Sequence, residues 1–264
     1  MPLPFVAATW NVNSLRMRLE RLLLWLAERR PDILCLQELK MEASLFPTEQ
    51  LRQAGYHAAV VGQKAYNGVA VLSRIEHGEL VDVVPGLQDD VDDPEARLIA
   101  ATVPALGVRV LSVYVPNGQV VGSDKFAYKL AWLRRLRRYL DQRCDPAAPL
   151  LVCGDFNIAP EDRDVHDPEL WKDTVICHPE ARQGLDEVRA WGLDDALRLV
   201  CPDGGLYTYW DYRQLAFPKN HGLRIDHVLC SRPLSQRVQE VLIDRQARKG
   251  KHPSDHAPLL VTFR

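Results

Sequence analysis

Apolar runs of strand length recur along the whole chain, and the residues that bound them are often acids, amides or histidines. Runs of this length between turn-forming residues are typical of β-strands. The pattern predicts strands near residues 5–10, 32–37, 56–61, 68–73, 79–84, 97–103, 108–115, 149–154, 225–231, 238–244 and 257–263.

Two longer segments carry apolar residues at the spacing of one helix face. They predict helices over 15–30 and about 124–141, with Ser14 and Ser123 placed to cap their first turns. The inner faces would consist of Leu15, Leu19, Leu22, Leu23 and Leu26 in the first helix and of Phe126, Leu130, Leu133 and Leu140 in the second. Shorter helices are expected around 47–54, 180–191 and 194–200.

The order of these elements bears on the fold class. Helices alternate with strands in places, but 56–115 holds several strands with no helix between them. This mixture favours an α/β fold with two mixed β-sheets packed face to face and flanked by helices, rather than a doubly wound parallel sheet. With 264 residues, 47% of them hydrophobic, and no long linker, we expect one domain over 1–264.

The net charge of −2 does not by itself indicate a nucleic-acid-binding protein. The cations are clustered, however, first over 125–143 and again over 245–251, just before Ser254-Asp255-His256. The second cluster would bring positive charge to the rim of an acidic pocket, an arrangement that fits a long polyanion. The first cluster is better explained as a helix face that stays in water.

The six cysteines show no CxxC spacing, and Cys35, Cys153 and Cys230 lie inside apolar runs. They are typical of small buried hydrophobic residues in a reducing compartment rather than of a disulfide framework. The longest apolar run, 22–27, is far shorter than the about 20 residues that a membrane-spanning helix needs, and no signal-peptide pattern opens the chain. We therefore expect a cytoplasmic protein that does not act at a membrane.

The polar residues at the ends of the apolar runs are the candidate chemistry. In α/β proteins the ends of core strands gather at one edge of a sheet, so residues far apart in sequence can converge there. A pocket formed by Glu38, Asp155, Asp226, Asp255 and His256 would be strongly anionic. Such a pocket invites a divalent cation.

Gly154-Asp155-Phe156-Asn157 follows the apolar run 149–153. Because residues two apart on an extended segment face the same side, Asp155 and Asn157 could both point into one pocket. A carboxylate that takes a proton, beside an amide that fixes orientation, can activate a water molecule. The alternative is a strand followed by an ordinary Asx turn.

Two histidines directly follow aspartates, in Asp226-His227 and Asp255-His256. Neighbouring side chains of a strand point to opposite faces, so only one of Asp226 and His227 can enter the site, and we expect His227 to be satisfied on the far face. His256 paired with a carboxylate such as Asp226 would be held in one orientation with its cationic form favoured. It could then donate a hydrogen bond to a phosphate oxygen.

Two further strand ends carry candidates. Glu38 ends the buried run 33–36 and would be costly without a partner, which could be a metal ion or Lys40. Tyr114 and Asn117 bring a phenol and an amide to the same edge. The alternative for Tyr114 is a tyrosine at the rim of the core.

Sequence blocks in a fixed order along nearly the whole chain carry a resemblance. They are WNVNSLR at 10, DILCLQELK at 32, YNGVAVLSR at 66, YVPNGQ at 114, SDKFAYKLAWL at 123, LLVCGDFNIAP at 150, YTYWDYR at 207, LRIDHVL at 223 and SDHAPL at 254. Together they resemble the exonuclease III family of AP endonucleases, within the endonuclease/exonuclease/phosphatase superfamily. The resemblance implies a four-layered α/β sandwich that cleaves the phosphodiester 5′ to abasic sites in duplex DNA, often with 3′-to-5′ exonuclease activity.

The resemblance also implies a metal ion and a base. Glu38 would ligate the metal, with Asn11 and Asp255 near it. Hard oxygen ligands, without the cysteine or paired-histidine spacing of a zinc site, favour Mg²⁺ or Mn²⁺. Asp155 would activate the attacking water, oriented by Asn157. Whether Asp155 or the Asp226–His256 pair is the base stays open, and we favour Asp155.

The remaining implied roles concern the substrate. Asp226 would orient His256, which with Tyr114 and Asn117 would hold and polarise the phosphate. The segment from Tyr209-Trp210 to Leu223-Ile225 resembles the pocket for a flipped-out abasic sugar, although Trp210 is alternatively an ordinary core residue. The candidate substrate-binding residues are completed by Lys40, Arg248 and Lys249.

Two positions depart from parts of the family. Asn13 stands where some branches carry an acid, so a possible second carboxylate near the metal is absent. Leu223 stands where the animal branch has a tryptophan, which leaves the balance between abasic-site and exonuclease cleavage open.

The leading prediction is a metal-dependent DNA repair nuclease that acts as a monomer on duplex DNA with abasic sites or 3′ ends, with no obligate protein partner. The alternative is a phosphodiesterase or phosphatase of the same superfamily acting on lipid or inositol-phosphate substrates, for which we would expect a membrane-docking apolar hairpin or a headgroup pocket. A catalytically dead DNA-binding module should have lost one of the acids, yet Glu38, Asp155, Asp226 and Asp255 are all present.

Overall fold

A computed structural model of the chain describes residues 3–264. It contains two six-stranded sheets, one in the order β11-β12-β1-β2-β4-β3 and the other in the order β5-β6-β7-β8-β10-β9. The first sheet consists of β1 (Phe5–Asn11), β2 (Ile33–Gln37), β3 (Tyr56–Val61), β4 (Val69–Arg74), β11 (Val238–Ile243) and β12 (Leu259–Phe263). The second consists of β5 (Val81–Pro85), β6 (Leu98–Val103), β7 (Val108–Tyr114), β8 (Leu150–Asp155), β9 (Leu193–Asp195) and β10 (Asp226–Ser231).

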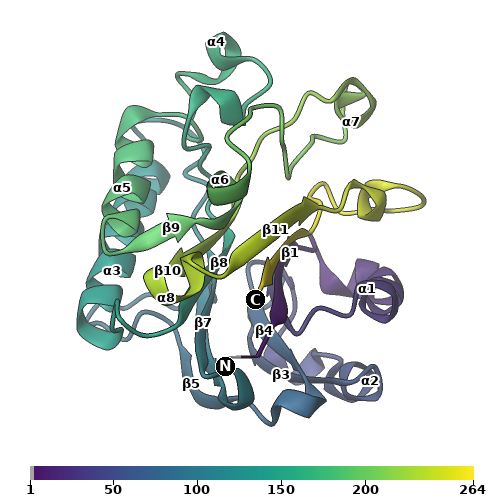
Figure 1. Cartoon of the computed structure of the whole chain (residues 1–264). Coiled ribbons are helices and arrows are strands. Elements are labelled where there is room, and N and C mark those ends of the chain that lie inside the picture. The colour runs from purple at the N-terminus through teal and green to yellow at the C-terminus, as the bar shows by residue number, and fades with distance from the viewer. Residues whose placement is uncertain (1–2) are drawn as a thin grey trace.

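The longer helices lie outside the two sheets (Figure 1). The first sheet is flanked by α1 (Leu15–Arg29) and α2 (Thr48–Gln53), and the second by α3 (Asp124–Arg143) and α5 (Pro179–Arg189). The connections also contain the short helices α4 (Pro168–Trp171), α6 (Ala196–Val200), α7 (Ala216–Lys219) and α8 (Arg232–Ser235).

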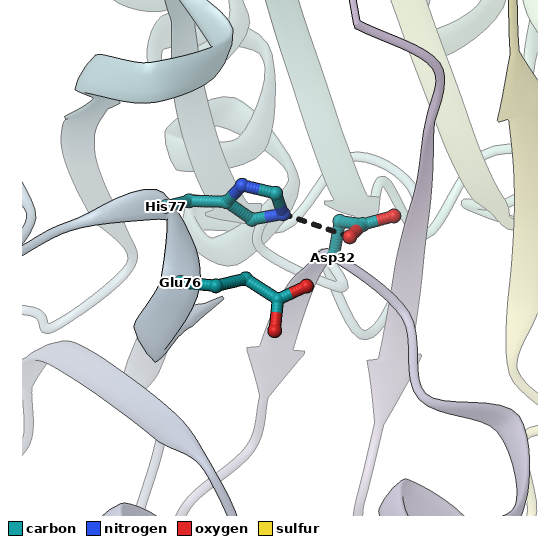
Figure 2. A group of neighbouring side chains, drawn as sticks. All are labelled: Asp32, Glu76 and His77. Carbon is teal, nitrogen blue, oxygen red and sulfur yellow. Dashed lines mark hydrogen bonds and ion pairs between the residues drawn. The ribbon is translucent and has the colours of Figure 1, made fainter.

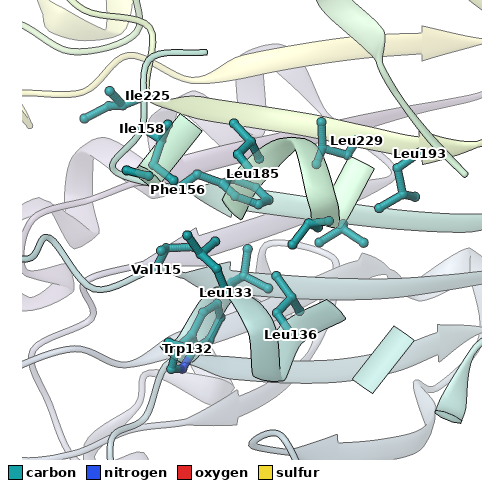
Figure 3. Packing of buried hydrophobic residues seen from close by; sticks show 14 of the residues in the cluster. Val115, Trp132, Leu133, Leu136, Phe156, Ile158, Leu185, Leu193, Ile225 and Leu229 are labelled. Carbon is teal, nitrogen blue, oxygen red and sulfur yellow. The ribbon is translucent and has the colours of Figure 1, made fainter. Parts of the chain in front are cut away.

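Hydrophobic clusters separate successive layers. Along β2, Ile33 and Cys35 pack between the two sheets, whereas Leu34 and Leu36 pack in the cluster that contains the inner face of α1. Figure 3 shows the cluster on the far side of the second sheet, where side chains of α3 and α5 meet those of β8 and β10. Because each central strand buries both faces, its sequence is a continuous apolar run. The predicted architecture of two mixed sheets between helices, in four layers, is confirmed.

Two local predictions differ from the structure. Ser123 caps α3 as predicted, since its Oγ accepts a hydrogen bond from the Phe126 amide at 3.2 Å. Ser14 does not cap α1: its side chain makes no capping bond, and its backbone amide instead donates to the Glu38 carbonyl at 2.8 Å. The helix expected around 194–200 begins only at Ala196, because residues 193–195 pair with β10 as the edge strand β9.

The strand directions bring the predicted site residues to one edge. β1 and β2 are parallel, so Asn11 and Glu38 leave the first sheet side by side. β8 runs parallel to β7 and ends at Asp155, and antiparallel β10 begins opposite it, with Asp226 paired to Asp155. β12 is antiparallel to β1, so the segment before β12, which contains His256, returns to the same edge. Convergence of the acids is therefore a consequence of strand order and direction.

The predictions from composition concern cysteines and membranes. All six cysteines are unpaired, and Cys35, Cys153 and Cys230 are buried between the sheets, as predicted. Over residues 3–264, none of the helices combines the length and the apolar character that a bilayer crossing requires.

Candidate active site

The carboxylates predicted to converge belong to one site. A carboxylate oxygen of Glu38, one of Asp155 and a ring nitrogen of His256 lie within 4.8 Å of one another. Asp226 joins this group through His256, since its Oδ2 lies 2.8 Å from Nδ1 of the ring. Asp255 lies beside the group rather than in it. Its Oδ1 accepts a hydrogen bond at 2.9 Å from Asn13.

Asn11 lies between two of the acids. Its Nδ2 donates to Glu38 Oε1 at 2.8 Å and to Asp155 Oδ2 at 2.9 Å, while its Oδ1 accepts from the Asn13 amide at 2.9 Å. Hydrogen bonds from one amide thus hold together two carboxylates that would otherwise repel each other. In this arrangement Asn11 positions the acids, and its direct ligation of a metal stays a prediction.

Glu38 also has a cationic partner and a phenolic one. Lys40 Nζ lies 2.8 Å from Glu38 Oε2, and Tyr114 Oη donates to Glu38 Oε1 at 3.0 Å. Burial raises the pKa of Glu38, but the charge of Lys40 and the hydrogen bonds from Asn11 and Lys40 outweigh it and leave the pKa below its usual value. Burial and the neighbouring Glu38 charge raise the pKa of Tyr114 well above its usual value, so the phenol stays a donor.

The Asx turn and the candidate catalytic pair are the same structure. The Asn157 amide donates to Asp155 Oδ1 at 2.8 Å, and Asn157 adopts a left-handed φ of 51°, which asparagine tolerates. The Asn157 side chain donates from Nδ2 to the Val115 carbonyl at 3.0 Å and accepts at Oδ1 from Asn117 Nδ2 at 3.0 Å. The Asx turn and the predicted catalytic role of Asp155 and Asn157 are therefore compatible. Asn117 is connected to these two residues through its bond to Asn157.

The electrostatics of the site distinguish a proton acceptor, Asp155, from a hydrogen-bond donor, His256. Burial raises the pKa of Asp155 to about 7, with cationic His256 opposing the shift and Asp226 reinforcing it. Burial lowers the pKa of His256, but the charge and hydrogen bond of Asp226 outweigh it and raise the value to about 10. At neutral pH His256 is a cation, and the pKa of Asp155 lies near the value that suits a general base.

His227 faces away from the site, as predicted. Its ring lies 3.0 Å from the Arg224 guanidinium on one side and 3.0 Å from the Ile158 carbonyl on the other. Arg224 is fully buried and ion-paired with Asp164 and Asp195. Sequence reasoning missed this network behind the site, although an arginine within the apolar block before β10 was a signal for it.

The candidate sugar pocket differs from the prediction. Trp210 is 0% exposed and packs in a small core cluster, with its Nε1 3.2 Å from Asn220 Oδ1. The core alternative therefore holds for Trp210, and Leu223 is buried as well. Tyr209 keeps exposed surface and packs edge-on against His256, with 5.0 Å between ring centroids.

The basic rim also differs from the prediction. Arg248 is 6% exposed, because its Nη2 donates to the Trp210 carbonyl at 2.7 Å and its guanidinium packs over Tyr212 and Phe217. The expectation that Arg248 meets a polyanion at the surface is wrong, since the side chain turns inward and braces the 209–217 segment. Lys249 is exposed and remains a candidate.

A second group of possible ligands lies at the opposite edge. Asp32 precedes β2, and His77 Nε2 lies 2.8 Å from its Oδ1, with Glu76 beside them (Figure 2). Arg74 pairs with both acids, at 3.4 Å from Asp32 and 2.7 Å from Glu76. Because a guanidinium already neutralises these carboxylates, the group is a structural ion cluster.

A divalent cation fits the group around Glu38 on its donor chemistry. The convergent donors are carboxylate oxygens together with one imidazole that Asp226 already engages. Asp226, which joins the group through His256, has a buried Oδ1 without a hydrogen-bond partner. Such a set suits a hard cation such as Mg²⁺ or Mn²⁺.

Two face-to-face sheets with acids gathered at one edge are typical of a class of hydrolases, and comparison of the chain with known proteins identifies that class. The model of the Endonuclease/Exonuclease/phosphatase family matches residues 8–256. Exodeoxyribonuclease III of Haemophilus influenzae is 34% identical over 266 residues, which cover 97% of this chain and 98% of that protein. The chain belongs to the exonuclease III/AP endonuclease family.

Solved structures agree with this assignment. An AP endonuclease from Archaeoglobus fulgidus superposes with a TM-score of 0.93 at 40% identity, over 98% of this chain and 99% of that chain. The 3′ phosphatase NExo from Neisseria, bound to a product DNA hairpin, also gives a TM-score of 0.93, at 42% identity and the same coverage.

Proposed function

We propose that the chain is a metal-dependent DNA repair nuclease that hydrolyses the phosphodiester 5′ to abasic sites in duplex DNA and also removes nucleotides from 3′ ends. The main observation in support of this proposal is that Glu38, Asp155 and the Asp226–His256 pair converge at one sheet edge. The family supports a DNA repair nuclease, and the relatives include an exodeoxyribonuclease III, an AP endonuclease and an enzyme bound to product DNA.

In this proposal Glu38, with Asn11 and Asp255 near it, would hold Mg²⁺ or Mn²⁺, which supplies positive charge to the phosphate oxygens. Asp155 accepts the proton of the attacking water, since its pKa of about 7 suits a base at neutral pH. His256, with a pKa of about 10, already carries its proton and so serves as a donor to the phosphate rather than as the base.

Further donors surround the expected phosphate. Tyr114 stays protonated, and Asn117 presents an amide that is bonded to Asn157, while Asn157 itself would orient the attacking water. Donors fixed before the reaction stabilise the charge that develops on phosphate oxygens without having to reorganise. Lys40, Tyr209 and Lys249 remain candidate substrate contacts, and we take the chain to act as one domain and as a monomer in the cytoplasm.

The test uses a duplex oligonucleotide with one stable abasic analogue, incubated with and without Mg²⁺. We expect nicking immediately 5′ to the analogue, abolished by a chelator and reduced by ~10²- to 10⁴-fold in Asp155→Asn, because the proton acceptor is removed. Unchanged nicking by Asp155→Asn would refute the role of that carboxylate. Turnover of phospholipid or inositol phosphate without any action on DNA would favour the alternative function.

A further inference from the structure

Lys129 is a buried lysine that the proposed chemistry does not use. It lies on the inner face of α3 with no exposed surface. Burial lowers the pKa of its ammonium to about 7, with the charge of Asp155 opposing the shift. No carboxylate of residues 3–264 lies within ion-pair distance of its nitrogen. Burying an unpaired cation is costly, and a methionine of similar length would fill the same space without that cost.

The ammonium is held by backbone carbonyls instead. Lys129 Nζ donates to the carbonyl of Asn117 at 3.1 Å, of Asn157 at 2.7 Å and of Val175 at 2.7 Å. An ammonium has three donors, so these three acceptors satisfy it completely. Carbonyl oxygens that converge on one point repel one another unless a donor lies between them. The lysine therefore ties three segments together at one point, in addition to the bond between the Asn117 and Asn157 side chains.

Two of these segments carry side chains of the candidate active site. Asn117 follows β7 and Asn157 follows β8, and their amides are bonded to each other at 3.0 Å. Lys129 holds the backbone of both residues, so it fixes both ends of this amide pair. Asn157 also adopts the left-handed conformation, which asparagine tolerates, and the bond from Lys129 to its carbonyl helps to keep the residue in place.

The loop before α3 is built around the lysine stem. Gly118 has a φ of 93°, and a Cβ placed there would lie 3.1 Å from Lys129 Cδ and 3.3 Å from Phe126. A larger residue at 118 would press on the stem, so the close approach of the loop to α3 depends on this glycine.

We propose that Lys129 is a positioning residue, whose ammonium holds the backbone carbonyls of Asn117 and Asn157 and so directs the Asn117 amide toward the scissile phosphate and the Asn157 amide toward the attacking water. The lysine acts through the two asparagines and does not touch the substrate. This inference rests on the proposed function, which gives the two amides their role.

The first experiment compares Lys129→Met with the wild type on the abasic duplex. We expect kcat to fall on the order of 10²-fold, as for a small misplacement of catalytic groups, with the dissociation constant for DNA nearly unchanged. The control is Leu136→Ala, a buried residue of the same helix that packs only in the hydrophobic core and should lower thermal stability while leaving kcat intact. In an Asn157→Ala background, Lys129→Met should cost clearly less than in the wild type, because the part of its effect that passes through that amide is already lost. Full additivity of the two losses would overturn the proposal.

A second readout needs no DNA cleavage and separates this inference from the proposed function. In ¹⁵N-labelled protein, Lys129→Met should shift or broaden the side-chain amide signals of Asn117 and Asn157 and leave that of Asn220 unchanged. Unchanged signals for all three would overturn the proposal even if the nuclease activity is as expected. If Lys129→Met does not fold, Lys129→Ala supplies the test: n-propylammonium, which replaces the missing atoms, should restore kcat, whereas n-propanol should not. Equal rescue by both compounds, or by neither, would count against the proposal.

Discussion

At the scale of single residues, the site is a chain of pairs in which one side chain sets the charge of the next. Asp226 keeps His256 cationic, and His256 in turn lies 3.8 Å from Asp155 and lowers its pKa. Lys40 and Asn11 together keep Glu38 ionised despite its burial. Each group is thus prepared for its role before a substrate arrives, which is what electrostatic preorganisation requires.

The Asp226–His256 pair predicts a specific change in pH dependence. His256 donates to the phosphate while it is protonated, so activity should persist up to its pKa of about 10 and fall as the pH rises through that value. Asp226→Asn removes the charge that raises the pKa of His256. The pH at which kcat/KM falls on the alkaline side should therefore move toward neutral pH. The measurement is kcat/KM from pH 6 to well above the His256 pKa of about 10, at saturating Mg²⁺. The control Asp32→Asn, at the opposite edge, should move neither limb, and an unchanged alkaline limb in Asp226→Asn would contradict this role.

Residue identities were predictable from sequence where strand geometry fixes direction. The alternation of side chains along a strand correctly sent Asp226 into the site and His227 away from it. The inward turn of Arg248 was not predictable, because it depends on where the 209–217 segment packs. A surface-like run of cations contains both Arg248, which is buried, and Lys249, which is exposed.

At the scale of elements, the position of Asp155 depends on how closely β8 approaches β7. A Cβ on Gly154 would lie 1.9 Å from the Val113 carbonyl oxygen, far inside van der Waals contact. Only glycine allows the two parallel strands this approach, and the approach sets Asp155 beside Tyr114 in the register. The glycine before the candidate base is therefore a packing requirement of the sheet.

Gly154→Ala should accordingly damage both stability and activity. Its Cβ meets backbone atoms that cannot move alone, so β7 or β8 must shift and displace Asp155, and we expect the nicking rate to fall by about 10²-fold with a lower Tm. The matched control is Gly184→Ala in α5, where the new Cβ meets the Leu133 side chain and alanine favours the helix. We expect a small Tm change and normal nicking there. Equal effects of the two substitutions would argue against strand spacing as the cause.

Elements with a strong period were predicted and weakly periodic ones were not. The 3.6-residue pattern identified α1 and α3 nearly to their ends, because one face of each buries a long apolar stripe. The edge strand β9 was mistaken for the start of a helix, since its three residues are strands only by virtue of pairing with β10. Non-local pairing of so short a segment leaves no periodic signal.

At the scale of the whole molecule, sequence predicted two sheets and one shared edge but not which strands are neighbours. The order β5-β6-β7-β8-β10-β9 places β10 next to β8, although 70 residues separate Asp155 from Asp226 in the chain. That pairing sets Asp226 opposite Asp155 and so completes the site. Local patterns do not contain such pairings, whereas the resemblance to a family does, because it carries a whole topology.

DNA binding is also a property of the whole surface, since a chain with a net charge of −2 must place its cations where the DNA runs. Lys249 is an exposed candidate on the rim, so Lys249→Ala should weaken binding of duplex DNA and reduce the slope of log K against log salt by about 1. Arg248→Ala should leave the slope unchanged and lower Tm, because it removes a bond to the Trp210 carbonyl and packing against Tyr212. The measurement is the dissociation constant at several salt concentrations in an Asp155→Asn background, which prevents cleavage. A flatter slope for Arg248→Ala would mean that its side chain turns outward to meet phosphate, and an unchanged slope for Lys249→Ala would remove the basic rim from the binding surface.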